Sequence, residues 1–123
     1  MKRIFYILDD DHNPVETDST EWSKWLNEGD RRRVELDIFE NKCNVSTVFL
    51  GINHAFDDGP PILFETMIFG GRFDEYQERY FTWDEAIAGH EKALRMIMNR
   101  AYETEDYELV KLINERLKEQ TTK

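Results

Sequence analysis

Three carboxylates, an imidazole and an amide stand together near the N-terminus, in the run DDDHN at residues 9–13. All of these groups can bind metal ions, but an EF-hand calcium loop places glycine at its sixth position and glutamate at its twelfth. Counted from Asp9, those positions hold Pro14 and Thr20. Asp and Asn also bond their own backbone in turns, and proline fixes the exit of the chain. The run therefore predicts a turn rather than a metal site.

The same carboxylates are candidates for contact with a partner. The chain has 123 residues and a net charge of −10, from 16 basic and 26 acidic side chains. Such a field repels nucleic acids and anionic membranes, and it favours encounter with a basic protein surface. Solubility alone is the simpler explanation. The residues that we select as partner-binding candidates are Asp9, Asp10, Asp11, Asp57 and Asp58.

The three histidines allow two kinds of chemistry. His12 and His54, with an acidic residue, would make a two-histidine, one-carboxylate site of a metal-dependent enzyme. No His-x-His or His-Glu-x-x-His motif is present, so the sequence assigns no metal ligands and no cofactor. His90 falls on the apolar stripe of a helix. There we expect a neutral imidazole that donates to a backbone carbonyl, with a ligand-facing role as the alternative.

Glu65 and the arginines are the remaining candidates for ligand binding. Glu65 interrupts an apolar strand, so it needs a partner, either in the run RRR at residues 31–33 or at Arg79. Within the run, Arg31 and Arg33 point to the same face of a strand, where they pair with the chain's own acids or bind an anion. A nucleotide-like ligand in a pocket between subunits would use Arg31, Arg33, Glu65 and His90.

Nucleophilic catalysis finds no support in the sequence. Ser46 and Thr47 lie in a predicted strand without a Gly-x-Ser-x-Gly elbow, and Cys43 has no activating neighbour. Phosphate-binding glycine loops are absent as well. We therefore expect no catalytic residues. One cysteine cannot form an intramolecular disulfide, and no segment approaches the roughly 20 apolar residues of a membrane span, so we expect a cytoplasmic protein.

The expected elements form one α+β domain over residues 1–123. A short helix follows Asp18, with Glu21 in capping-box position and Gly29 beyond its end; a second helix follows the capping box at Thr82. Thr104 is expected to cap a third, so that residues 102–120 form an extra C-terminal helix. Strands are predicted over residues 3–8, 34–38, 45–52, 62–69 and 76–81. Their order predicts an antiparallel sheet of about five strands, with the short N-terminal helix and the two C-terminal helices packed on it.

The strand patterns also predict which faces are buried. Apolar and acidic residues alternate over residues 34–38, which is typical of a strand with one face in water. Residues 45–52 and 62–69 do not alternate cleanly, so both faces of that hairpin need cover. The C-terminal helices can cover one face. The helix with Trp22 and Trp25, a second subunit in a homodimer, or a ligand would cover the other.

Several runs resemble a family of small proteins encoded by phages and prophages. They are YILDDDHNPV at 6–15, VSTVFLG at 45–51, GPPILFETM at 59–67, YQERY at 76–80 followed by Thr82 and Trp83, and GHE at 89–91. The resemblance covers roughly residues 4–95, and the helix after Tyr102 is an individual extension. It implies a phage accessory protein in the bacterial cytoplasm, but no catalytic residues to carry over. Our leading hypothesis is a non-enzymatic protein that binds and modulates a host protein or defence system. A sponge for a nucleotide-like signal and a metal-dependent enzyme are the alternatives.

Overall fold

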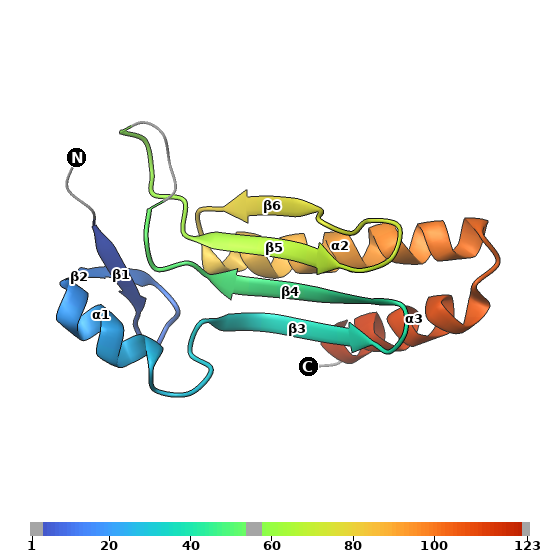
Figure 1. Ribbon diagram of the computed structural model, residues 1–123, viewed down its shortest axis with the longest axis horizontal. Coiled ribbons are helices and arrows are strands. Elements are labelled where there is room, and N and C mark those ends of the chain that lie inside the picture. The colour runs from blue at the N-terminus through green and yellow to red at the C-terminus, as the bar shows by residue number, and fades with distance from the viewer. Residues whose placement is uncertain (1–3, 54–57, 122–123) are drawn as a thin grey trace.

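The strands of this protein divide into two antiparallel sheets, β1-β2 and β3-β4-β5-β6 (Figure 1). The computed structural model describes residues 4–53 and 58–121, without the side chains of residues 120 and 121. The α+β class and the antiparallel pairing are confirmed, whereas a single sheet of five strands is not found. The elements are β1 (Phe5–Leu8), β2 (Pro14–Thr17), α1 (Ser19–Leu26), β3 (Arg33–Phe39), β4 (Cys43–Phe49), β5 (Phe64–Phe69), β6 (Gln77–Tyr80), α2 (Trp83–Glu103) and α3 (Tyr107–Thr121).

Strand β2 is the element that the sequence analysis missed. It has four residues, begins with a proline and carries no apolar stripe, so the usual strand signals are weak. It pairs with β1, which takes β1 out of the larger sheet. The two sheets still touch, because the backbone N–H of Tyr6 donates to the carbonyl of Gly51 at 2.8 Å and Phe5 forms a bridge with Ile52.

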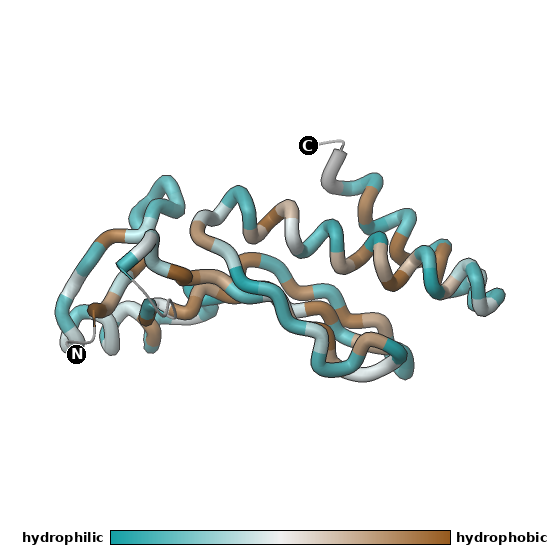
Figure 2. The backbone as a smooth tube through the Cα atoms, turned by 90° about the horizontal axis from the view of Figure 1, so that it is seen from above, coloured by the Kyte–Doolittle hydropathy of each residue, from teal (hydrophilic) through white to brown (hydrophobic). Residues whose placement is uncertain are grey.

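Helices α2 and α3 lie on one side of the four-stranded sheet only (Figure 2). Beneath them is the main core, made of Phe39, Val45 and Ile68 from the sheet, Ala93, Leu94, Ile97 and Ala101 from α2, and Leu109, Ile113 and Leu117 from α3. The predicted cover of one face by the C-terminal helices is therefore confirmed. A second cluster joins the N-terminal unit to the end of this sheet through Leu8, Trp25, Phe49, Leu63, Phe64 and Ala86.

The opposite face of the four-stranded sheet carries exposed apolar side chains. Ile38 on β3 is 60% exposed and Phe69 on β5 is 48% exposed. Register places them in one row across the sheet, separated by Asn44 on β4. Helix α1 packs against β1 instead of covering this face. The sequence indicated that both faces of the sheet need cover. The described part of the chain covers one face and leaves these side chains of the other face exposed.

Two of the three predicted helix starts are confirmed. Asp18 accepts a hydrogen bond from the backbone N–H of Glu21 at 2.8 Å, and Thr82 and Glu85 form a reciprocal capping box. The prediction for Thr104 is wrong. Its hydroxyl donates to the carbonyl of Arg100 at 3.0 Å, at the C-terminal end of α2, and Asp106 accepts from the backbone of α3 instead. The left-handed Glu105, at φ 63°, ends α2 and moves the start of α3 along the chain.

The predicted polarity of β3 is also wrong. We expected its acidic side chains to face water, but Asp37 is 8% exposed and its neighbour Ile38 is 60% exposed. The acidic side of the strand faces α2 and α3, where a histidine and an arginine meet it. Alternation fixes only that the two faces differ, and the partners on the helices decide which face lies inside.

Candidate functional site

The most connected polar group in the structure lies between the sheet and the helices. Thr47 on β4 is 2.6 Å from Thr66 on β5, measured between their hydroxyl oxygens. The Thr47 hydroxyl is also 2.7 Å from Nδ1 of His90 on α2, and Nε2 of His90 is 2.8 Å from Oδ2 of Asp37 on β3. A carboxylate only accepts, so Nε2 carries the proton and donates to Asp37. A hydroxyl can donate or accept, so the Thr47 hydroxyl and Nδ1 form the second hydrogen bond of the ring.

Arg116 on α3 completes this buried network. Its Nε donates to Oδ1 of Asp37 at 2.6 Å, and its Nη2 donates to Glu35 at 2.5 Å. Burial raises the pKa of Asp37, but hydrogen bonds from His90 and Arg116 outweigh that effect and hold it below its usual value. The network of Thr66, Thr47, His90, Asp37, Arg116 and Glu35 thereby joins three strands to both C-terminal helices.

The order hydroxyl, imidazole, carboxylate is that of a nucleophilic triad, but this one is sealed. Thr47 is fully buried and His90 is 1% exposed. The three main cavities of the described part of the chain are lined by neither Thr47, His90 nor Asp37. A nucleophile must reach its substrate, so the network serves the fold. The expected partner of His90, a backbone carbonyl, is wrong, because Asp37 on the neighbouring strand accepts its proton instead.

Four of the nine binding candidates chosen from the sequence meet at the N-terminal end of the molecule. A cavity of about 430 Å³ opens there between the β1–β2 turn, the segment after α1 and the start of α2. We call it the N-terminal groove. It brings the acidic and the basic candidates together on one surface. Its lining residues are Leu8, Asp9, Asp10, His12, Trp25, Asp30, Arg31, Arg33 and Trp83.

The β1–β2 turn holds the acidic side of the groove in place. The side chain of Asp9 accepts from the backbone N–H groups of Asp11 and Asn13, each at 2.9 Å, which confirms the predicted turn. His12 takes the left-handed conformation, at φ 64°. Its ring stacks on Trp83, with centroids 3.8 Å apart and planes inclined by 7°. The turn thus orients an aromatic pair and leaves the Asp10 side chain exposed beside it.

The basic side of the groove is paired with the chain's own acids. Arg31 lies 2.9 Å from Glu28, and Arg33 lies 3.4 Å from Asp30. The guanidinium group of Arg31 is also 6.0 Å from the ring of Trp25. Three aspartates line the groove against two arginines. The groove therefore favours a cationic or mixed-charge ligand over a multiply charged anion.

The other candidates lie outside the groove. Glu65 is 8% exposed on the open face of the sheet, where it accepts from Arg79 at 2.9 Å and from Gln77, so Arg79 is the partner that it needed. Asp11 and Asp58 are exposed but do not line the groove. Asp57 and His54 fall outside the described residues.

The described residues contain no group of three His, Cys, Asp or Glu side chains that could hold a metal ion.

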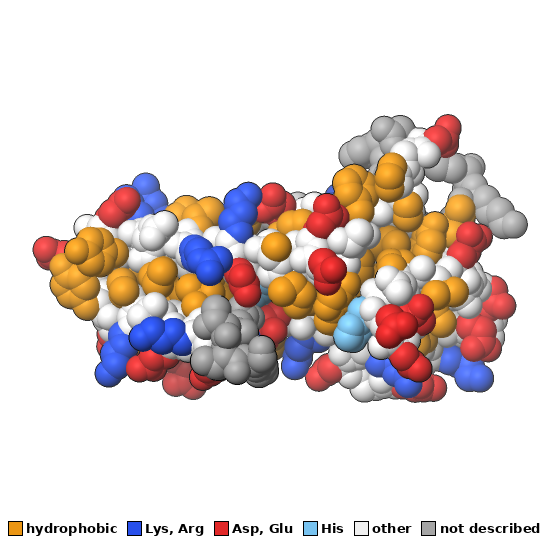
Figure 3. Space-filling view, turned by 180° about the vertical axis from the view of Figure 1, so that it is seen from behind, with side chains coloured by type: hydrophobic (Ala, Val, Ile, Leu, Met, Phe, Trp, Pro, Cys, Tyr) orange, Lys and Arg blue, Asp and Glu red, His pale blue; other side chains and the backbone are white. Residues whose placement is uncertain are grey.

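Acidic residues do not share one face of the molecule. Asp9–Asp11 lie at the N-terminal end. The β5–β6 loop, with Asp74 and Glu75, and the α2–α3 turn, with Glu105 and Asp106, lie at the opposite end (Figure 1). Acidic and basic side chains alternate over the helical side (Figure 3). The attraction for a basic partner is therefore local to clusters such as the one beside the groove.

Sequence reasoning missed that Trp25 and Trp83 line the groove, and it missed most of the buried network. Trp25 and Trp83 appeared only as apolar positions of two helices, because their sequence neighbours carry no signal that the two helices approach each other. Asp37 and Arg116 are 79 positions apart. The one usable signal was the acidic residue at every second position of β3, and it was assigned to the wrong face.

Comparisons with protein-family models, with curated proteins and with solved structures found no match to this chain. Within the described residues, none of the helices combines the length and the apolar character needed to cross a membrane.

Proposed function

We propose that this chain acts by binding another protein, without catalysis, and that the N-terminal groove receives a basic segment of that partner. The observation that carries the proposal is the convergence of exposed aspartates with Trp25, Trp83 and two arginines around one cavity. Tryptophan and arginine dominate the binding energy of protein interfaces. A lysine or arginine of the partner would meet the carboxylates of Asp9 and Asp10, beside the stacked rings of His12 and Trp83.

The same proposal agrees with the burial of the Thr47–His90–Asp37 arrangement. The one triad-like arrangement among the described residues is buried beneath two helices. The proposed setting is the cytoplasm of a bacterial host, in which a phage accessory protein meets a host protein or a defence factor. Local acidic charge beside an aromatic floor favours capture of a basic surface.

A nucleotide-like ligand is the weaker proposal. Its phosphates would need arginines that are free to bind them, but Arg31 and Arg33 already face Glu28 and Asp30. A thermal-shift screen with cyclic and linear nucleotides distinguishes the two proposals, because a bound nucleotide raises the melting temperature and a protein-directed binder gains nothing from it.

The decisive experiment compares two charge-reversed variants in capture from bacterial lysate. One carries Asp10→Lys and Asp11→Lys beside the groove, which leaves the turn-forming Asp9 unchanged. The control carries Glu40→Lys and Glu115→Lys, two exposed positions away from the groove, so the net charge changes equally. We expect wild type and control to recover the same partner and the groove variant to lose it. Equal loss in both variants would mean that only overall charge matters.

We also propose that the open face of the four-stranded sheet pairs with a second copy of this chain. Ile38 and Phe69 are the exposed apolar side chains that support this proposal. Sedimentation velocity tests it. A wild-type dimer that Ile38→Lys converts into a folded monomer supports the proposal, and a wild-type monomer at high protein concentration refutes it.

A further inference from the structure

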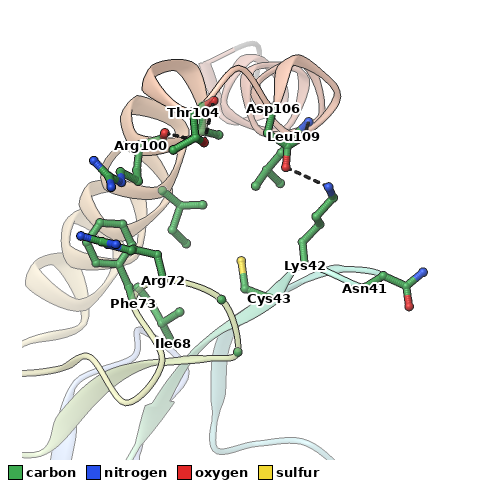
Figure 4. Close-up of a pocket in the computed structure, with 14 residues that line it drawn as sticks. Asn41, Lys42, Cys43, Ile68, Arg72, Phe73, Arg100, Thr104, Asp106 and Leu109 are labelled. Atoms are coloured by element: carbon green, nitrogen blue, oxygen red, sulfur yellow. Dashed lines mark hydrogen bonds and ion pairs between the residues drawn. The ribbon is translucent and has the colours of Figure 1, made fainter.

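A second cavity lies at the opposite end of the molecule from the groove and shares no lining residue with it. It measures about 290 Å³ and is enclosed by the β3–β4 turn, the β5–β6 loop and the ends of α2 and α3 that face them. We call it the C-terminal pocket. Figure 4 shows its lining side chains arranged around a space between the two helices and the sheet. Its volume is near the lower end of the range for small-molecule sites, about 300–1,000 Å³.

The interior of the C-terminal pocket is apolar. Ile68 from β5, Ile97 and Ala101 from α2 and Leu109 from α3 line it. Cys43 projects its sulfur into the space between the strands and the helices (Figure 4). Burial raises the pKa of this thiol, so it serves as a small apolar wall group and reacts only slowly as a nucleophile.

The rim of the pocket is basic, although the whole chain carries a net charge of −10. Arg72 and Arg100 extend to the same side of the cavity (Figure 4). Within the described part of the chain, Arg72 has no carboxylate within ion-pair distance. Arg100 bonds Glu103 at 3.0 Å through Nη1, but its Nε is buried without an acceptor. That nitrogen is covered by the protein itself, but the Arg100 side chain as a whole is 37% exposed, so a ligand can reach it from solvent.

The loop opposite the helices is built to leave this space open. Gly70 and Gly71 both have left-handed backbones, at φ 84° and 72°. A Cβ on Gly71 would lie 3.3 Å from the carbonyl oxygen of Lys42. The glycines therefore let the β5–β6 loop pass close to the β3–β4 turn. Lys42, which also lines the pocket, is paired with Asp106 at 2.8 Å.

From this arrangement we infer that the C-terminal pocket binds a small amphipathic carboxylic acid. The apolar body fills the space between Ile68, Ile97 and Leu109, and the carboxylate bonds the guanidinium groups of Arg72 and Arg100. Planar guanidinium groups match a carboxylate well, and one negative charge suits a rim with two arginines, one of them already shared with Glu103. The inference does not depend on the proposed role of the N-terminal groove.

Protection of Cys43 from alkylation measures occupancy directly, because the chain has no other thiol. The probe is 4-phenylbutyrate, and its neutral isostere 4-phenylbutanamide tests the need for charge. Mass spectrometry follows the single adduct formed with N-ethylmaleimide. Methyl NMR signals of Ile68, Ile97 and Leu109 provide a second readout that does not depend on thiol reactivity.

The variants Arg72→Gln and Arg100→Gln keep the fold and remove one cation each. Arg95→Gln is the matched control, since Arg95 lies on the same helix as Arg100, pairs with Glu91 and does not line the pocket. We expect 4-phenylbutyrate to protect Cys43 at submillimolar concentration and the amide to require about tenfold more. Each pocket variant should weaken protection about tenfold, with the control unchanged.

Three results would overturn the inference. Equal protection by acid and amide would show that the arginines do not recognise charge. Equal loss in Arg95→Gln would assign the effect to net charge. Neither protection nor methyl shifts at millimolar 4-phenylbutyrate would mean that water alone occupies the pocket.

Discussion

The buried network and the N-terminal groove contain the same kinds of side chain, but the network holds the fold together and the groove is open to a ligand. Each contains one histidine, carboxylates and arginine. In the network, His90 is 1% exposed and bonded at both ring nitrogens, so every group is used internally. In the groove, His12 and Asp10 are exposed beside a cavity. Residue type and even mutual geometry thus say less about function than access does, and the triad-like order under the helices is a structural device.

The largest effect is expected from Asp37→Asn. This change leaves Arg116 facing one carboxylate fewer and weakens the hydrogen bond from His90. We expect the free energy of unfolding to fall by about 3 kcal/mol, near the lower limit for a fully buried pair, because Arg116 is partly exposed to solvent. Urea denaturation measures it. The matched change in the groove, Asp10→Asn, should alter stability by less than about 0.5 kcal/mol. Similar losses at both positions would remove the distinction between the two regions.

Gly89→Ala should also destabilise the protein, at the contact between α2 and β6. This is expected although alanine favours helices by about 1 kcal/mol over glycine. Gly89 is buried in α2 against Tyr80, and an added Cβ would overlap the tyrosine ring and hydroxyl. We expect a net loss of about 2 kcal/mol from overpacking, read from thermal unfolding. A gain in stability would show that α2 can move away from β6, and that the packing of α2 on the sheet is less rigid than we describe.

The stability of the protein should depend on pH through Asp37. Its pKa is lowered in the folded state, so its contribution is complete above the unfolded value of about 3.9 and disappears as the pH falls through the folded value. Unfolding free energies measured from neutral pH down to about pH 2 should fall less steeply for Asp37→Asn than for wild type. Parallel curves for the two proteins would place the acid-sensitive group elsewhere.

His12→Ala should affect the fold less than Asp37→Asn or Gly89→Ala. Loss of its stacking on Trp83 should lower the unfolding free energy by about 0.5–1 kcal/mol, because the ring is exposed. Partner capture should fall by a larger factor than this loss explains, since the variant removes part of the aromatic surface of the groove. If His12→Ala captured the partner as well as wild type does, the binding site in the groove would consist of the carboxylates without the aromatic pair.

The sequence predicted those parts of the structure that depend on local rules. The N-caps at Asp18 and Thr82, the aspartate-rich turn and the hairpin of β4 and β5 are set by neighbouring residues, and all of these are found. The weak strand β2, by contrast, is fixed by its pairing with β1, and no local signal announces it. The start of α3 shifted because a left-handed residue follows Thr104, and such a conformation is rarely visible in sequence.

The candidate site was only half predictable, for a related reason. Exposed acids and arginines could be chosen by type, and the fold does bring Asp9, Asp10, Arg31 and Arg33 to one groove. Their meeting with Trp83 depends on how α2 approaches the β1–β2 turn, which is a long-range contact. His90 was correctly placed on a buried face, but its partners come from two strands.

The three tryptophans allow the most direct test of the central claim that the N-terminal groove is the binding surface. Trp25 and Trp83 line the groove, whereas Trp22 lines a different cavity. Indole N–H signals in NMR report each of them separately during titration with a lysine-rich peptide. Our account predicts that the signals of Trp25 and Trp83 shift while that of Trp22 stays in place, and that Asp10→Lys with Asp11→Lys abolishes the shifts. A shift of Trp22 alone, or no shift at peptide saturation, would contradict it.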